Sequence, residues 1–213
     1  MVSIYTKAAV ITVILFAANF MFIKVLDDNR ANEIITQLEE VELQSHSSRL
    51  LFQYLQTIKA EPENACPALE QKTKEQATKT YQAFAKLQTA KAENIVSGTD
   101  PLDKKYLLAN SELLLDVYNL QKLCDSNFIE PILYFYPHGK CIECQAQAEV
   151  LEQVKAECQN ARVFAFPLSS DLGFLEVIKK QQDVTQAPSL VINDKTFKGL
   201  TSKNDALKHL KCQ

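Results

Sequence analysis

Residues 132–144 read Ile-Leu-Tyr-Phe-Tyr-Pro-His-Gly-Lys-Cys-Ile-Glu-Cys, and this stretch decides the fold of the C-terminal part of the chain. The apolar run 132–136 predicts a buried strand, and the pattern after Cys144 predicts a helix. Two cysteines at positions i and i+3 of a first helical turn lie on one face, close enough to form a disulfide. Cys141 would lie where backbone N–H groups and the positive end of the helix dipole stabilise a thiolate. Such a pair (CxxC) is suited to thiol–disulfide exchange, because a thiolate attacks and a second thiol resolves the mixed disulfide.

The segments around the CxxC pair predict a small α/β domain over residues 128–213. Apolar strands that alternate with helices indicate a parallel sheet core, and residues 193–195, Asn-Asp-Lys, predict a hairpin turn. The expected strands are 132–136, 162–167, 189–192 and 196–198, and the expected helices are 141–158, 174–182 and 202–210. The expected core is apolar: Val150, Leu151, Val154, Phe164, Phe166, Val177, Ile178, Leu190 and Ile192.

The order strand, CxxC helix, strand, helix, hairpin, helix resembles the thioredoxin fold, and this resemblance covers only the C-terminal domain. In that family the loop before the hairpin carries a cis-proline beside the CxxC pair, and Ala187-Pro188 occupies this place, with Gly199 closing the last strand. The resemblance implies that Cys141 is the exposed attacking cysteine and Cys144 the buried resolving one. It also implies that the backbone at Ala187 and Pro188 forms a groove that pairs with an extended substrate segment.

Two positions depart from the family pattern. Many thioredoxins have a tryptophan before the first cysteine, where this chain has Lys140, and a buried acid in the preceding strand, where this chain has Phe135. The charge of Glu143 disfavours a nearby thiolate, that of Lys140 favours it, and His138 is close enough in sequence to modulate the pair. The sequence therefore predicts an oxidoreductase without deciding between an oxidant and a reductant.

Two other interpretations of the CxxC pair stay open. His138, Cys141 and Cys144 could supply three ligands of a zinc site, although the proline loop argues against metal and we expect none. The pair could also be a structural disulfide in a thioredoxin-like binding or assembly module without catalytic activity. No organic cofactor is expected in either case.

The N-terminal segment predicts a single transmembrane helix. After Lys7, an apolar run over residues 8–26 is interrupted only by a few polar residues, and it is long enough to cross a bilayer. A cleaved signal peptide is the alternative. The flanking charges orient the helix poorly, but six cysteines favour an oxidising compartment. We therefore expect residues 1–7 in the cytoplasm and the bulk of the chain in a periplasmic or other extracytoplasmic space.

Residues 27–127 predict an all-helical bundle. The first helix has an apolar seam, residues 61–64 interrupt the pattern, Pro67 suits the start of a second helix, and residues 97–101 separate it from a third. The bundle could serve as a spacer, a docking surface or a seam for a homodimer. The predicted apolar seam of the first helix consists of Ile34, Leu38, Val41, Ser45, Ser48, Phe52 and Leu55. The predicted apolar face of the second helix consists of Leu69, Ala77, Tyr81, Phe84 and Leu87, and that of the third consists of Leu102, Tyr106, Ala109, Leu113, Val117, Leu120 and Cys124.

The four remaining cysteines predict two structural disulfides. Cys66 stands near the start of the second helix and Cys124 at the end of the third, which are brought together if these helices are antiparallel neighbours. The alternative is a pair of buried free cysteines. Cys158 ends the CxxC helix and Cys212 follows the last helix; the resemblance implies that both helices share one sheet face, so these cysteines could meet. If either stayed free, it could form a bond between chains.

Charge and compartment limit the partners. The net charge is −3 with both signs interspersed, so no basic face indicates binding to nucleic acid. The expected partners are exported cysteine-containing proteins, a redox donor or acceptor in the membrane, and the lipid bilayer around residues 8–26.

Overall fold

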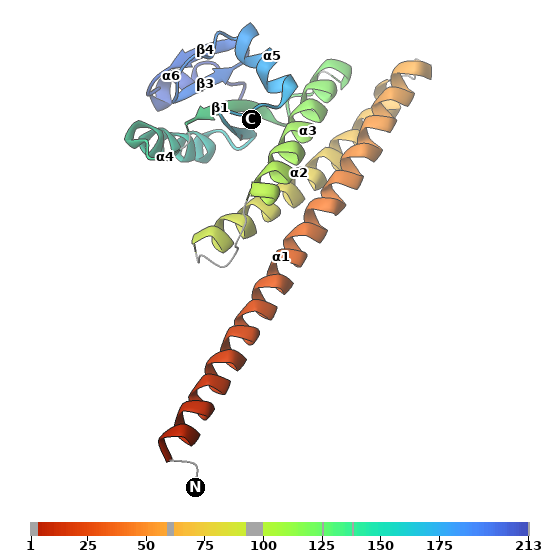
Figure 1. Ribbon diagram of the computed structural model, residues 1–213. Coiled ribbons are helices and arrows are strands. Elements are labelled where there is room, and N and C mark those ends of the chain that lie inside the picture. The colour runs from red at the N-terminus through yellow and green to blue at the C-terminus, as the bar shows by residue number, and fades with distance from the viewer. Residues whose placement is uncertain (1–3, 59–61, 93–99, 125, 138, 213) are drawn as a thin grey trace. The chain divides into compact units, whose positions relative to one another are not determined.

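The computed structural model describes residues 4–58, 62–92, 100–124, 126–137 and 139–212 (Figure 1). It combines a helical N-terminal part with a four-stranded mixed sheet and its helices, so the expected mixture of an all-helical and an α/β part is confirmed. The helices of the N-terminal part are α1 (Ile4–Ile58), α2 (Pro62–Ala92) and α3 (Asp100–Cys124). The C-terminal part contains β1 (Glu130–Tyr136), α4 (Ile142–Glu157), β2 (Ala161–Pro167), α5 (Gly173–Gln181), β3 (Ser189–Ile192), β4 (Lys195–Lys198) and α6 (Lys203–Leu207).

The chain divides into two compact units. One contains Met1–His46 and Gln76–Ala109, and the other contains Ser47–Glu75 and Asn110–Gln213. The division therefore cuts through α1, α2 and α3. The unit that holds the sheet also includes the start of α2 and the end of α3.

The first part of α1 is strongly apolar. The segment Lys7–Leu26 has 20 residues with a mean hydropathy of 2.3, and none of it is buried. By length and composition it could cross a membrane, and a signal sequence has the same properties. Together with three disulfides, this helix indicates an exported or membrane-anchored protein.

In the unit that contains this segment, α1 packs against α2. Leu38 of α1 is buried in a cluster with Ala83 and Leu87 of α2, and Ile35 and Tyr106 lie at its margin. Two ion pairs flank the cluster, Lys79 with Glu40 at 2.6 Å and Lys86 with Glu33 at 2.7 Å. Of the predicted seam, Leu38 and Val41 are buried, and the other side chains lie outside the described residues.

Two expectations about α2 were wrong. The helix begins at Pro62, where a missing N–H costs nothing, and Pro67 lies inside it and removes one helical hydrogen bond. Tyr81 is 58% exposed, because the buried stripe of α2 passes through Thr80 instead. The sequence pattern followed apolar residues alone and so missed a stripe that includes a buried threonine. Residues 61 and 97–99 of the predicted breaks lie outside the described part of the chain.

The four strands form a sheet in the order β2-β1-β3-β4. β1 pairs in parallel with β2, from Glu130 opposite Ala161 onward, while β3 runs antiparallel to β1 and to β4. The predicted hairpin turn is present: Asn193 and Asp194 have φ of 46° and 61°, which a two-residue turn of this hand requires. The apolar pattern thus predicted the parallel pair, and the turn residues predicted the antiparallel one.

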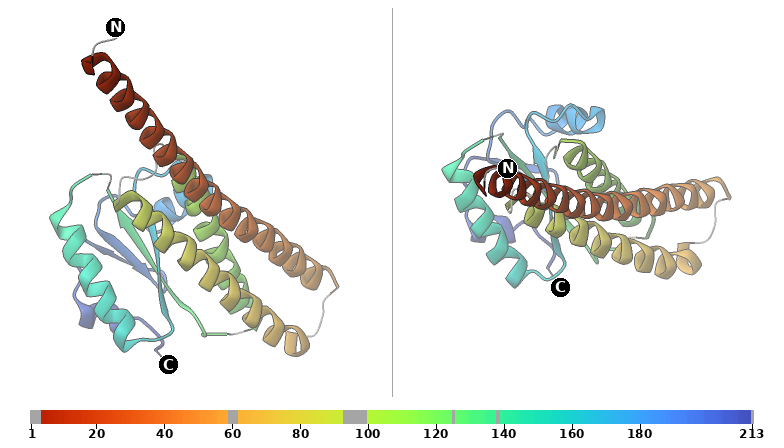
Figure 2. Two further views of the ribbon diagram at one scale, coloured as in Figure 1. Left: turned by 90° about the horizontal axis from the view of Figure 1, so that it is seen from below. Right: turned by 60° about the horizontal axis from the view of Figure 1, so that its bottom comes forward.

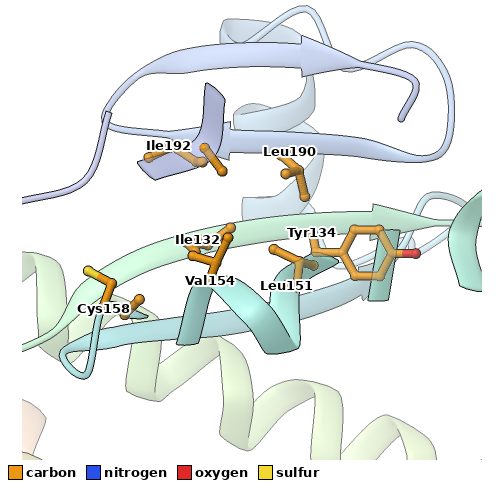
Figure 3. Close-up of a cluster of buried hydrophobic side chains, with 9 residues drawn as sticks. Ile132, Tyr134, Leu151, Val154, Cys158, Leu190 and Ile192 are labelled. Atoms are coloured by element: carbon orange, nitrogen blue, oxygen red, sulfur yellow. The ribbon is translucent and has the colours of Figure 1, made fainter. Parts of the chain in front are cut away.

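Helices α4 and α6 cover one face of the sheet (Figures 1 and 2). Ile132 of β1 and Leu190 of β3 contact a cluster that includes Leu151 and Val154 of α4, as Figure 3 shows. The opposite face carries Phe166, which meets Phe174 of α5 edge-on with ring centroids 6.3 Å apart. The sheet is therefore a middle layer between helices.

The predicted core of this part is largely correct. Phe164 and Phe166 are fully buried, as are the predicted core residues of β3. Val177 is 53% exposed, and Leu175 is the fully buried residue of α5. Residues two apart on a helix point to opposite sides, so the error is one of helical phase. Helix α6 is also shorter than predicted, beginning after the N-cap Ser202 and ending at Leu207.

Candidate active site

The CxxC pair lies at the N-terminal end of α4. Cys141 is the N-cap residue, with extended backbone (φ −143°, ψ 106°), and it forms a disulfide with Cys144 across a Cα–Cα distance of 5.2 Å. The backbone N–H of Cys144 donates a hydrogen bond to Cys141 Sγ at 3.1 Å. The first sulfur therefore occupies the position in which helix N-caps accept hydrogen bonds.

The two cysteines of the pair lie partly at the surface. Cys141 and Cys144 are each partly exposed, and the roles of attacking and resolving cysteine stay predictions. Cys144, in the first turn of α4, packs against the cluster between α4 and the sheet. Ile142 between them is 85% exposed. An incoming disulfide would meet the pair at the surface of the molecule.

The flanking charged side chains point into solvent. Lys140 and Glu143 are exposed, where salt screens their effect on a neighbouring sulfur. Gly139 precedes them with φ of 95°, a conformation that glycine adopts without strain and that turns the chain toward α4. His138 lies outside the described residues.

Tyr134 connects the strand before the pair to the pair itself. Its hydroxyl donates a hydrogen bond to the carbonyl oxygen of Cys144 at 3.1 Å. Burial raises the pKa of Tyr134, and the neighbouring Tyr136 raises it further, so the phenol keeps its proton at physiological pH. Phe135, at the position where the family has an acid, is fully buried on the other face of the sheet. The sequence missed this role of Tyr134, although strand alternation indicated which face it occupies.

The proline loop reaches the same end of the sheet. The peptide bond between Ala187 and Pro188 is cis, and β3 begins at the next residue. Because Phe135 lies opposite Ser189 in the antiparallel register, Pro188 lies level with Tyr136, where β1 leads into the CxxC loop. Pro188 is buried and Ala187 partly exposed. The two segments that the resemblance assigned to one site thus lie at one end of the sheet.

The other four cysteines form the two predicted disulfides. Cys66 pairs with Cys124 across a Cα–Cα distance of 5.7 Å, and Cys158 pairs with Cys212 across 4.9 Å. All six cysteines of the chain are therefore paired. The second disulfide fixes the C-terminal end of the helix that carries the CxxC pair.

The zinc interpretation finds no further ligands in the structure. Within the described residues, no three or more His, Cys, Asp or Glu side chains lie close enough to hold a metal ion. His138, the third residue of that interpretation, lies outside them.

No protein-family model matches this chain, and neither a curated protein nor a solved structure matches it. Its function is therefore inferred from the chemistry of the CxxC site and from the segment that precedes it.

Proposed function

We propose that this protein is an extracytoplasmic thiol–disulfide oxidoreductase with a thioredoxin-like C-terminal domain, held at the membrane by residues 8–26. The observation that carries the proposal is the disulfide between the partly exposed residues Cys141 and Cys144 at the N-terminus of α4. Cys141 Sγ there accepts the N–H of Cys144 at 3.1 Å. When the disulfide opens, this N–H and the helix dipole stabilise a thiolate on Cys141. The strand-to-helix order and the proline loop level with the end of β1 also support a thioredoxin-like domain.

The proposed reaction is a pair of exchanges at sulfur. The Cys141 thiolate attacks one sulfur of a substrate disulfide, the substrate S–S bond breaks, and the other substrate sulfur leaves as a thiolate that takes up a proton. Cys144, as a thiolate, then attacks Cys141 in the mixed disulfide and releases the second substrate thiol. The substrate gains two electrons and the CxxC pair loses them; the reverse sequence oxidises a substrate dithiol.

The surroundings of the pair support an exported location. Three disulfides persist in oxidising compartments, and the segment Lys7–Leu26 accounts for export or anchoring. The substrates are then exported cysteine-containing proteins, and a thiol–disulfide donor or acceptor in the membrane restores the pair. For the helical part we propose a role as a spacer, a docking surface or a seam for a homodimer.

The decisive test is capture of a reaction intermediate by the full-length protein in its own membrane. The Cys144→Ser variant should accumulate mixed disulfides through Cys141, seen as species that disappear on reduction, and the matched Cys141→Ser variant should not. The Cys141–Cys144 pair should equilibrate with glutathione at a reduction potential between about −120 and −270 mV. A potential below about −300 mV with no captured partner would instead make the pair a structural crosslink.

A second function is favoured by one observation. Phe135 is fully buried where many thioredoxins have an acid, so this position supplies no carboxylate to deprotonate Cys144. This would suit a non-catalytic thioredoxin-like module that binds or assembles partners. In that case the Cys141→Ser, Cys144→Ser double variant would keep cellular function, whereas the exchange reaction requires its loss.

A further inference from the structure

A fully buried glutamine links the CxxC helix to another part of the chain. Gln147 lies on α4 one turn after Cys144, and its side chain has no exposed surface. Its Oε1 accepts the backbone N–H of Thr201 at 2.7 Å, and its Nε2 donates to the Thr201 carbonyl oxygen at 3.3 Å. One side-chain amide thus pairs with both backbone polar groups of one residue 54 positions away. We call this pair of bonds the Gln147 clamp.

The clamped residue belongs to the turn that follows β4. Gly199 has φ of 82°, and Leu200, between it and Thr201, is 55% exposed. The N–H of Gly199 donates a hydrogen bond to the carbonyl oxygen of Pro188 at 2.8 Å. Hydrogen bonds and the backbone of the turn 199–201 therefore connect the CxxC helix, through Gln147, to the proline loop.

Helix packing alone does not call for a glutamine at this position. Helix α4 is already held to the sheet by Leu151 and Val154, and at its C-terminal end by the disulfide of Cys158. A buried amide is costly unless every polar atom finds a partner, and an apolar residue would serve packing equally well. What Gln147 adds is a fixed spacing between the CxxC end of α4 and the turn 199–201.

We propose that Gln147 is a positioning residue for extended protein substrates. This inference rests on the proposed thiol–disulfide exchange. The clamp fixes the turn 199–201 and the Pro188 backbone relative to Cys141. An extended substrate chain that pairs with the proline loop is then held with its disulfide at Cys141 Sγ. A small disulfide contacts only the sulfur of Cys141, so its reaction does not depend on the clamp. Substrate size therefore separates positioning from the chemistry of the cysteines.

The test compares two substrates with full-length protein in detergent, with excess dithiothreitol to return the Cys141–Cys144 pair to its dithiol form after each turnover and the uncatalysed rate subtracted. The first is glutathione disulfide, and the second is a short apolar peptide whose single cysteine is in a mixed disulfide with glutathione. Gln147→Met keeps the shape and removes both bonds. We expect it to raise KM for the peptide about tenfold, with kcat and the rate toward glutathione disulfide within about twofold of the parent protein. Hydrogen exchange at the amides of Thr201 and Gly199 should accelerate.

A second variant changes the turn 199–201 and leaves the sequence of α4 unaltered. Gly199→Ala meets no atom closer than 3.9 Å, yet alanine disfavours a φ of 82°, so the turn should move. It should show the same selective rise in KM for the peptide. The matched control is Asn160→Ala, which removes two bonds of 2.9 Å to the carbonyl oxygens of Asn127 and Lys211 near the start of β1. This variant should leave both substrates unaffected.

Two results would overturn the clamp as a positioning device. One is a peptide KM that stays unchanged although Thr201 exchange accelerates. The other is an equal loss toward both substrates, which would mean general damage to the domain. Failure of the parent protein to turn over either substrate would refute the exchange reaction itself, and so is distinguishable from both.

Discussion

Tyr118 is a single residue whose ionisation depends on its position between α3 and the hairpin. It lines a cavity of about 310 Å³ together with Pro131, Val191 and Asp194. Burial, and to a smaller extent the charge of Asp194, together raise the pKa of Tyr118 from 10.0 to about 12. Because the folded protein keeps this proton where the unfolded chain has lost it, the stability that the group contributes is complete below pH 10 and is lost as pH rises toward 12.

Removing the charge of Asp194 should therefore lower the pKa of Tyr118. We expect the Asp194→Asn variant to have a Tyr118 pKa below that of the parent protein but above 10.0, because burial is the larger cause. NMR titration of the tyrosine ring measures the change. Asp171→Asn, an exposed aspartate between β2 and α5, is the control. An unchanged pKa in Asp194→Asn would show that the carboxylate does not act on the phenol.

At the scale of residues, the sequence predicted chemistry better than it predicted contacts. The positions of Cys141 and Pro188 follow from local spacing and from the order of elements, and the structure brings them to one end of the sheet. The role of Gln147 could not be predicted, because its partner is 54 positions away and is backbone rather than side chain. The role of Tyr134 could not be predicted for a similar reason, since its hydroxyl donates to the backbone carbonyl oxygen of Cys144.

At the scale of elements, helix α5 is fastened by one lysine. The side chain of Lys179 is only 12% exposed. Its ammonium group donates to the carbonyl oxygens of Leu168 and Ser170 at 2.8 and 3.0 Å, and pairs with Glu176 at 2.5 Å. The two carbonyls belong to the loop after β2, so this side chain ties that loop to the helix.

Loss of that lysine should destabilise the domain. Lys179→Met keeps the aliphatic stem but leaves two loop carbonyls without this donor, which should lower the free energy of unfolding by about 2 kcal/mol. Urea denaturation followed by circular dichroism measures the change. Lys155→Met is the matched control, because its ion pair with Glu152 is partly exposed and should contribute no more than about 0.5 kcal/mol. Equal effects of the two substitutions would contradict a special role for Lys179.

Element boundaries were predictable where local residues set them. Strand β3 has its predicted bounds, since Pro188 precedes it and the Asn193 turn follows it. Strand β1 begins at Glu130, two residues earlier than predicted, because its pairing with β2 extends to Ala161 opposite Glu130. The carboxylate of that buried residue accepts a bond from Asn193 at 3.2 Å. Nothing in the local sequence Glu130-Pro131 indicates that these two residues are buried at the start of a strand. Only the folded hairpin supplies the partner.

At the scale of the whole molecule, the two compact units are defined by contacts between residues and not by the change in composition along the chain. The sequence separated helical from α/β segments at residue 127 because the pattern changes there. The end of α3 nevertheless belongs with the sheet: Asn110 donates to the Ala165 carbonyl at 3.5 Å, and Gln121 donates to that of Ile129 at 3.1 Å. Lys74 of α2 also lies 5.2 Å from the ring centroid of Phe128.

The disulfide between Cys66 and Cys124 should be the largest single stabiliser of this arrangement. It closes a loop with a sequence separation of 58, for which loss of loop-closure entropy predicts about 4 kcal/mol. The Cys66→Ser, Cys124→Ser double variant should therefore unfold at a markedly lower urea concentration. The proposed exchange activity of Cys141, measured in the absence of urea, should persist. A variant as stable as the parent protein would show that packing of α2 and α3 alone holds this region.

The three disulfides follow one another along the chain without overlapping: 66 to 124, 141 to 144, and 158 to 212. The molecule is thus a string of separate covalent rings. A protease that cuts once inside either large ring leaves one molecule, whose two pieces part only on reduction. A cut between residues 125 and 140, or between 145 and 157, divides the protein at once. Reduction of the small ring between Cys141 and Cys144 changes neither outcome, so it leaves the covalent connectivity of both large rings intact.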